Sequence, residues 1–184
     1  MTTTKTRAGK PKKLVRPKAL TIDVRLAEIT SIDTPALVVN IFRGVKKPDG
    51  ATGAVDDALD GAITQLIQDG EIKGSAGETT LIHTFGKIKP KRVLVIGLGS
   101  QDEFDAQVIR RVSAEAVRFL RRKGICKAAT VAHGAGIGGF DPALSGQSVA
   151  EGAYLGLYKF GIYLTKNRDS ANEIENLTVV ELTL

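Results

Sequence analysis

The pattern of apolar positions predicts a series of short strands separated by helices. Residues 20–29 alternate apolar and polar side chains, as a half-buried strand at the edge of a sheet does. Residues 36–42 and 92–98 are continuous apolar runs rich in β-branched side chains, which is typical of strands buried on both faces. The other predicted strands cover 79–84, 126–132 and 177–184. A short turn sequence joins 79–84 to 92–98, so these two strands are expected to be hairpin neighbours.

Helical spacing of apolar residues predicts three helices between these strands. The first is expected from Val55 to about Gly70, after a loop at 43–53. The second follows the strand at 92–98, and the third is expected at 148–160.

The second helix is predicted to join two buried strands in a βαβ unit. Ser100 stands three residues before Glu103, which matches a capping box. Gly124 follows a basic last turn and is suited to a left-handed helix stop. The apolar face is expected to hold Phe104, Val108, Val112, Ala116 and Phe119. The crossover of such a unit is right-handed in nearly all proteins.

The order of elements predicts the fold class. Two strands, a helix, two strands, a helix, a strand, a helix and a last strand imply a three-layer α/β/α domain with a mixed, mostly parallel central sheet. A chain of 184 residues fits one such domain, which we place at 19–184. No apolar run approaches the ~20 residues of a membrane span, so no membrane contact is expected.

The net charge of +6 is concentrated in a basic tail at residues 1–18. Without the seven basic residues of this tail, 19 basic residues stand against 20 acidic ones. The composition of the tail predicts disorder. One hypothesis is a salt-sensitive contact with nucleic acid, and the simpler one is a solubilising leader. The seven residues are Lys5, Arg7, Lys10, Lys12, Lys13, Arg16 and Lys18.

The single cysteine, Cys126, falls at the start of a predicted strand. It cannot form an internal disulfide, and we expect an inert, buried thiol. This usage agrees with a reducing cytoplasm.

A glycine-rich loop follows the strand at 126–132. Gly134, Gly136 and Gly139 match G-x-G-x-x-G. A dinucleotide site would also need a helix opening at the last glycine and an acid ending the next strand, and both are missing here. Two alternatives remain: a loop that presents amides to a phosphate, in which Gly138 would also take part, or a turn that needs glycine for backbone reasons.

The other candidate residues are interpreted mainly as structural. Gly53 and Asp56 precede or open the first predicted helix and form a possible second ligand loop. Asp56 and Asp57 would lie in the first turn, where carboxylates complement the helix dipole rather than hold a metal. His83 and His133 end strands and are expected to be structural. No spacing assembles a catalytic or metal-ligand set, so no catalytic residue, metal or cofactor is predicted in this chain.

Four segments resemble the N-terminal domain of the leucyl aminopeptidase family of two-metal exopeptidases. They are 36–40 (ALVVN), 53–63 (GAVDDALDGAI), 92–99 (RVLVIGLG) and 150–166, which begins AEGAYLGLYKF and continues to YLTK. Each motif alone is moderately specific, but their order and spacing agree over about residues 20–184.

The resemblance implies a macro-domain-like α/β fold without an active site. In this family the catalytic domain lies C-terminal, carries two divalent ions of the zinc or manganese type, and holds the signature residues, none of which occur here. Full-length members are typically hexamers that remove N-terminal residues, often leucine, from peptides. We therefore expect a non-catalytic, cytoplasmic domain with an assembly or regulatory role, whose partner is the catalytic domain.

Macro domains suggest an alternative, the binding of ADP-ribose or a related nucleotide. In that family two loops cradle the ligand, and 50–57 and 134–140 occupy comparable places here. The usual Asn-Ala-Ala-Asn is replaced by Asn40-Ile-Phe-Arg43, and no acidic residue is well placed to recognise an adenine. Loss of binding is therefore the better expectation.

Overall fold

The computed structural model describes residues 19–134, 140–158 and 173–181. Within these residues, six strands form one sheet in the order β1-β6-β5-β2-β4-β3, and every neighbouring pair is parallel except β3–β4. The strands are β1 (Thr21–Leu26), β2 (Leu37–Phe42), β3 (Thr79–His83), β4 (Arg92–Gly99), β5 (Lys127–Val131) and β6 (Asn176–Glu181). The helices are α1 (Gly50–Ala58), α2 (Ala62–Gln68), α3 (Ala106–Arg122) and α4 (Pro142–Leu157), with short 3-10 turns η1 (Ile29–Ser31) and η2 (Gln101–Glu103).

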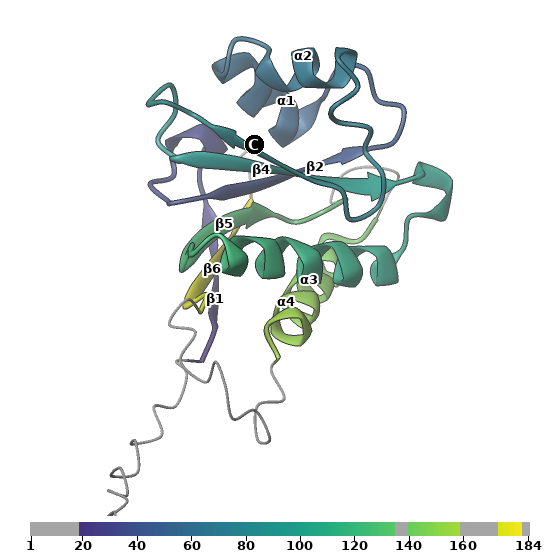
Figure 1. Cartoon of the computed structure of the whole chain (residues 1–184). Coiled ribbons are helices and arrows are strands. Elements are labelled where there is room, and N and C mark those ends of the chain that lie inside the picture. The colour runs from purple at the N-terminus through teal and green to yellow at the C-terminus, as the bar shows by residue number, and fades with distance from the viewer. Residues whose placement is uncertain (1–18, 135–139, 159–172, 182–184) are drawn as a thin grey trace, which may run out of the picture.

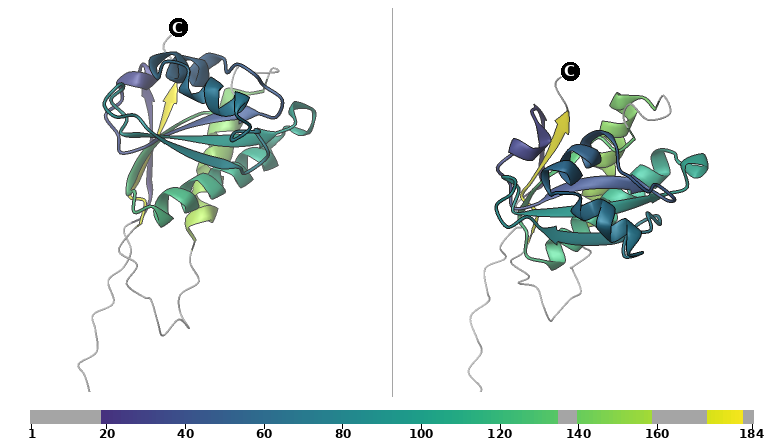
Figure 2. Two further views of the ribbon diagram at one scale, coloured as in Figure 1. Left: turned by 45° about the horizontal axis from the view of Figure 1, so that its top comes forward. Right: turned by 90° about the horizontal axis from the view of Figure 1, so that it is seen from above.

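The sheet is the middle of three layers. Figure 1 shows α1 and α2 over one face and α3 and α4 over the other, and the turned views in Figure 2 show the same arrangement. This confirms the predicted three-layer α/β class and the mixed, mostly parallel sheet. The hairpin of β3 and β4 is also confirmed, because these strands pair antiparallel from Thr79↔Ile96 to His83↔Arg92.

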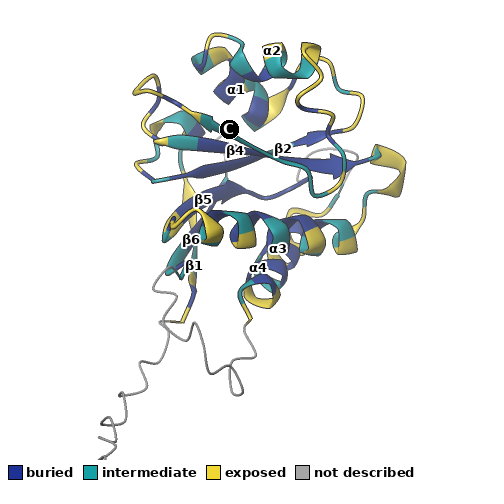
Figure 3. Cartoon of the chain, in the orientation of Figure 1, coloured by how far each residue is buried: buried dark blue, intermediate teal, exposed yellow. Residues whose placement is uncertain are grey.

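The central strands β2 and β4 are buried on both faces, as Figure 3 shows. Leu37 and Val39 of β2 belong to the cluster under α1 and α2, whereas Val38 belongs to the cluster under α3 and α4. The prediction from the continuous apolar runs is therefore correct. Two cores, one on each side, hold the layers together.

The unit β4–α3–β5 has the predicted order, but its helix starts later than the capping box suggested. Glu103 is the last residue of the turn η2. Ser100 precedes that turn, and its side chain makes no capping hydrogen bond. The N-cap of α3 is Asp105, whose carboxylate accepts a hydrogen bond of 2.8 Å from the Val108 amide. The capping-box prediction is wrong because Phe104 packs against other aromatic rings before the helix begins. The predicted stop is correct, since Gly124 has a φ of 70°.

The buried face of α3 only partly matches the expected one. Val112 and Ala116 are buried as predicted, while Val108 and Phe119 are half-buried. The remaining buried positions are Ile109, Ser113, Ala114, Val117 and Leu120.

The single helix predicted from Val55 to Gly70 is two helices. The chain breaks between α1 and α2, where Asp60 and Gly61 have φ values of 58° and 78°. α1 also begins at Gly50, so Gly53 lies inside a helix rather than in a loop. A Cβ at Gly53 would stand 2.9 Å from the Pro48 carbonyl oxygen, which explains why glycine is needed there.

Asp56 lies in the last turn of α1, not in the first turn of a helix. Its side chain is buried and accepts hydrogen bonds from the amides of Ile63 (2.7 Å) and Thr64 (3.0 Å) and from the Thr64 hydroxyl. The carboxylate therefore satisfies free amides at the start of α2. The prediction that Asp56 lies in the first turn of its own helix is therefore wrong, because its carboxylate bonds the start of the following helix.

Helix α4 packs closely on α3 through two glycines of the motif at 150–160. A Cβ at Gly152 would stand 2.3 Å from the Arg110 carbonyl oxygen, and one at Gly156 would stand 2.7 Å from Ala114. Glu151 forms an ion pair with Arg110 across the same contact. The helix begins at Pro142, earlier than the predicted 148, because Asp141 caps it.

Two further expectations at the ends of the sheet need correction. β1 is an edge strand as predicted, but Val24 and Leu26 are 67% and 71% exposed, so the alternation there does not mark buried positions. Cys126 precedes β5 and is half-buried, so the prediction of a buried thiol is wrong. In the described ranges no helix is both long and apolar enough to cross a membrane.

We predict that Asp56→Ala lowers the free energy of unfolding by about 2–3 kcal/mol, because two buried amides and a hydroxyl lose their acceptor. The measurement is urea denaturation followed by circular dichroism. Asp57→Ala is the matched control, since the Asp57 side chain follows Asp56 in the sequence but is exposed. Equal stability of the two variants would contradict this role of Asp56.

Candidate functional site

The candidate site lies where β2 and β5 end and where α1 and α4 begin. Asn40 of β2 and His133, which follows β5, are joined by a hydrogen bond of 3.1 Å between Asn40 Nδ2 and His133 Nδ1. The Thr52 hydroxyl of α1 donates to the Asn40 carbonyl oxygen at 2.6 Å. The fold thus brings the start of the glycine-rich loop beside β2 and α1.

His133 is a buried, neutral imidazole at this edge. Burial lowers its pKa from 6.5 to about 4. Because an amide nitrogen can only donate, Nδ1 accepts from Asn40, and the ring proton is assigned to Nε2, which lies 3.5 Å from the Thr130 hydroxyl. Both ring nitrogens thus face groups of the protein, which agrees with the expected structural role of His133. His83, by contrast, is exposed at the end of β3.

An aromatic cluster of Phe42, Phe104 and Phe140 lies over the first glycine of the loop. The Phe104 ring stacks edge-on against Phe42 at 5.0 Å between centroids and lies 5.4 Å from Phe140. Gly134 has a φ of 80°, and a Cβ there would stand 2.3 Å from the Phe104 ring. Gly134 is therefore required by backbone conformation and by aromatic packing. Gly136, Gly138 and Gly139 lie outside the described residues.

Carboxylates already occupy both helix N-termini at this edge. Asp49 accepts from the Gly50 amide at 2.6 Å at the start of α1, and Asp141 accepts from the Ala143 amide at 3.0 Å at the start of α4. A helix N-terminus attracts phosphate through its free amides and its dipole. Here an incoming phosphate would meet a negative side chain at each one, which disfavours anion binding.

The two residues of the possible second ligand loop both lie inside α1. Gly53 packs inside α1 against Pro48, and Asp56 holds the start of α2. Among the described residues, no group of three or more His, Cys, Asp or Glu side chains is placed to hold a metal ion.

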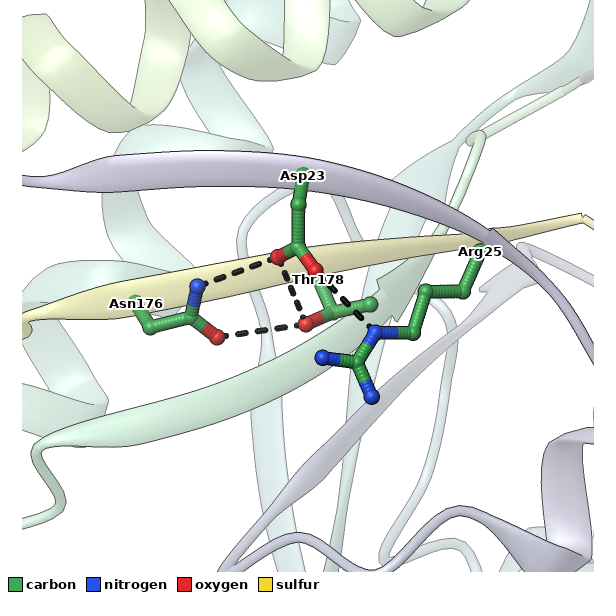
Figure 4. A network of polar contacts seen from close by, with 4 residues as sticks. All are labelled: Asp23, Arg25, Asn176 and Thr178. Carbon is green, nitrogen blue, oxygen red and sulfur yellow. Dashed lines mark hydrogen bonds and ion pairs between the residues drawn. The ribbon is translucent and has the colours of Figure 1, made fainter.

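Sequence reasoning missed a polar network at the other side of the sheet. Asp23 accepts hydrogen bonds from Asn176 (3.0 Å), Thr178 (2.9 Å) and Arg25 Nε (3.1 Å), as Figure 4 shows. The network borders an open cavity of about 640 Å³ between β1, β5, β6 and the segment before β2. Burial alone would raise the pKa of Asp23, but these hydrogen bonds and the Arg25 charge outweigh it, so the pKa lies below its usual value. In the sequence Asp23 is only one polar position in an alternating strand, and its partners Asn176 and Thr178 lie about 150 residues away.

We predict that Gly134→Ala destabilises the protein by about 2–4 kcal/mol. The alanine would have to adopt a left-handed backbone conformation, and its methyl group would overlap the Phe104 ring. Thermal and urea unfolding measure the effect. Gly146→Ala in α4 is the control, because a Cβ there meets nothing within 4 Å. If Gly134→Ala were as stable as the control, the close packing of Phe104 on this loop would be contradicted.

Comparison with known sequences identifies the family. The sequence profile of the cytosol aminopeptidase family, N-terminal domain, matches residues 38–167. A probable cytosol aminopeptidase of Alkaliphilus oremlandii is 36% identical over 159 residues, which cover 85% of this chain and 31% of that protein. A probable cytosol aminopeptidase of Geobacter sulfurreducens is 34% identical over 148 residues, which cover 80% of this chain and 29% of that protein. The chain thus spans about a third of the length of these relatives.

Comparison with solved structures confirms the macro-like fold. A tomato leucine aminopeptidase mutant superimposes with a TM-score of 0.71 at 14% identity, covering 92% of this chain and 34% of that one. The macrodomain of Mycobacterium tuberculosis DarG superimposes with a TM-score of 0.64 at 16% identity, covering 88% of this chain and 98% of that one. Since the family profile spans more than half of the sequence, the chain belongs to the cytosol aminopeptidase family and corresponds to its N-terminal domain.

Proposed function

We propose that this chain acts as a non-catalytic domain of a cytoplasmic aminopeptidase, with a role in assembly or regulation. Its partner would be a catalytic domain that holds two divalent ions and removes N-terminal residues from peptides. By the family resemblance, the full enzyme would be a hexamer. The curated relatives are named probable cytosol aminopeptidases and are about three times as long as the matched region, which supports this division of roles.

The proposal rests on the polar groups at the carboxyl edge of the sheet, which form hydrogen bonds within the protein. The His133 ring faces Asn40 and Thr130, the Phe104 ring lies against Gly134, and Asp49 and Asp141 cap the two nearby helices. A catalytic base or nucleophile must be within reach of a substrate. Here the groups that could do chemistry are used to join β2, β5 and the helices.

We predict that the purified chain does not hydrolyse leucyl-p-nitroanilide with Mn²⁺, Zn²⁺ or Mg²⁺. The Geobacter sulfurreducens relative, assayed under the same conditions, serves as a positive control. Metal-dependent turnover that stays proportional to the chain through two different purification steps would contradict the proposal.

The second candidate, a macro-type nucleotide site, is favoured by one observation. The loop that begins at Gly134 and the segment from Asn40 to α1 lie at the same edge, as the macro fold would place two ligand loops. The capping carboxylates and the Phe104 ring argue against it. We therefore expect no saturable binding heat when ADP-ribose is titrated into the chain by calorimetry up to sub-millimolar concentrations. A macro domain of known affinity for ADP-ribose is titrated in parallel as the positive control. Saturable heat would favour the nucleotide site and contradict the closed edge.

Nucleic-acid contact through the basic tail is a third candidate. Residues 1–18 lie outside the described residues, so this candidate rests on charge alone. It requires an affinity that falls steeply with salt and disappears when residues 1–18 are deleted.

A further inference from the structure

The outer edge of β1 carries exposed apolar side chains. Val24 is 67% exposed and Leu26 is 71% exposed. β1 stands at one end of the sheet, and among the described residues its one strand partner is β6. Soluble proteins protect such edges, because an edge strand is a template for pairing with another strand.

The backbone groups of the same residues point away from the sheet. The amides of Thr21 and Ala27 donate to β6, at 2.9 Å to Glu175 and 3.1 Å to Glu181. Since the hydrogen-bonding direction alternates along a strand, the odd-numbered residues of β1 face β6. Ile22, Val24 and Leu26 therefore present their N–H and C=O groups to the outer edge.

The order of residue types along β1 is symmetrical about Val24. The sequence Ile22-Asp-Val-Arg-Leu26 reads apolar, acidic, apolar, basic, apolar. We propose that β1 pairs antiparallel with β1 of a second copy of this chain, across a two-fold axis at Val24. The two sheets would then continue as one, through an interface made of the same surface on both copies.

This register satisfies the backbone. With the axis at Val24, Val24 opposes Val24 of the second copy, and Ile22 opposes Leu26. These are the residues whose amides and carbonyls point outward, so each pair exchanges hydrogen bonds. The residues between them form the non-hydrogen-bonded pairs, in which side chains approach more closely.

The charges match in the same register. Asp23 of each copy stands opposite Arg25 of the other, so the interface has two opposite-charge pairs and no like-charge pair. Arg25 is 66% exposed in its side chain, and only its Nε is bonded to Asp23 in Figure 4, where both terminal nitrogens are directed elsewhere. Charged residues on an edge strand often discourage pairing. Here their signs favour an antiparallel second copy.

The apolar side of β1 extends onto α4. The Tyr154 hydroxyl donates to the Leu20 carbonyl oxygen at 3.1 Å, which places this half-exposed ring beside the start of β1. Because Ile22 would oppose Leu26 of the second copy, that leucine would be covered near Tyr154. A six-residue strand and one tyrosine from each copy make a small interface, so the dimer should be weak and depend on concentration. The inference needs only the fold of this chain, not the proposed function.

The test is a register-specific cross-link. In a Cys126→Ser background, Val24→Cys places one thiol of each copy opposite the other. The two Cα atoms would be about 5.5 Å apart, a separation that a disulfide can span. Leu26→Cys is the matched control, because it is equally exposed but would oppose Ile22. With oxidised glutathione, Val24→Cys should form covalent dimer at least ~10-fold faster than Leu26→Cys. Equal rates would overturn the proposed register.

Sedimentation velocity provides a second measurement without cysteines. The wild-type chain should shift from monomer toward dimer as its concentration rises. Arg25→Asp should remain monomeric, because Asp23 of each copy would then face a second carboxylate across the axis. Leu155→Asp on α4, 67% exposed in the wild type, should dimerise normally. A wild-type monomer at every concentration, or a dimer unaffected by Arg25→Asp, would contradict the proposal.

Discussion

The burial of β2 and β4 on both faces is the constraint on which the rest of this structure depends. Strands with side chains such as Leu37, Val38 and Val39 need apolar cover above and below the sheet. α1 and α2 provide it on one face, and α3 and α4 provide it on the other. The close contact of α4 with α3 through Gly152 and Gly156 lets both helices fit over the same face. The three-layer architecture follows from this requirement.

The same constraint determines the character of the carboxyl edge. The helices must return to the sheet there, and polar groups are used to bind them to it: Thr52 joins α1 to β2, and Ser145 joins α4 to the His133 carbonyl oxygen at 2.7 Å. The polar groups that the structure describes at this edge are thus engaged by other residues of the same chain. This supports the proposal that the domain has a role in assembly or regulation rather than in catalysis. The symmetrical edge of β1 offers one surface for contacts with a second copy.

The sequence allowed the fold class, the strands and the family to be predicted, because long apolar runs and ordered motifs are local signals. It failed where a distant contact decides a local structure. The capping box at Ser100 and Glu103 is a valid local pattern, but packing of Phe104 delays the helix to Asp105. The role of Asp56 depends on the break at Gly61, which a helical pattern does not reveal. Asn176 and Thr178, which bond Asp23, and Asn40, which bonds His133, come from strands far away in the chain, so no spacing could indicate these contacts.

The most direct test of the closed carboxyl edge is an NMR titration of the imidazoles. The chain has only two histidines, and His83 is exposed while His133 is buried, so their signals can be assigned by a single substitution of His83. We predict that His133 stays neutral until the pH approaches its pKa of about 4 and keeps its proton on Nε2. Titration of His133 near its ordinary value of 6.5 would show that water reaches the ring, and would contradict an edge closed by the protein's own residues.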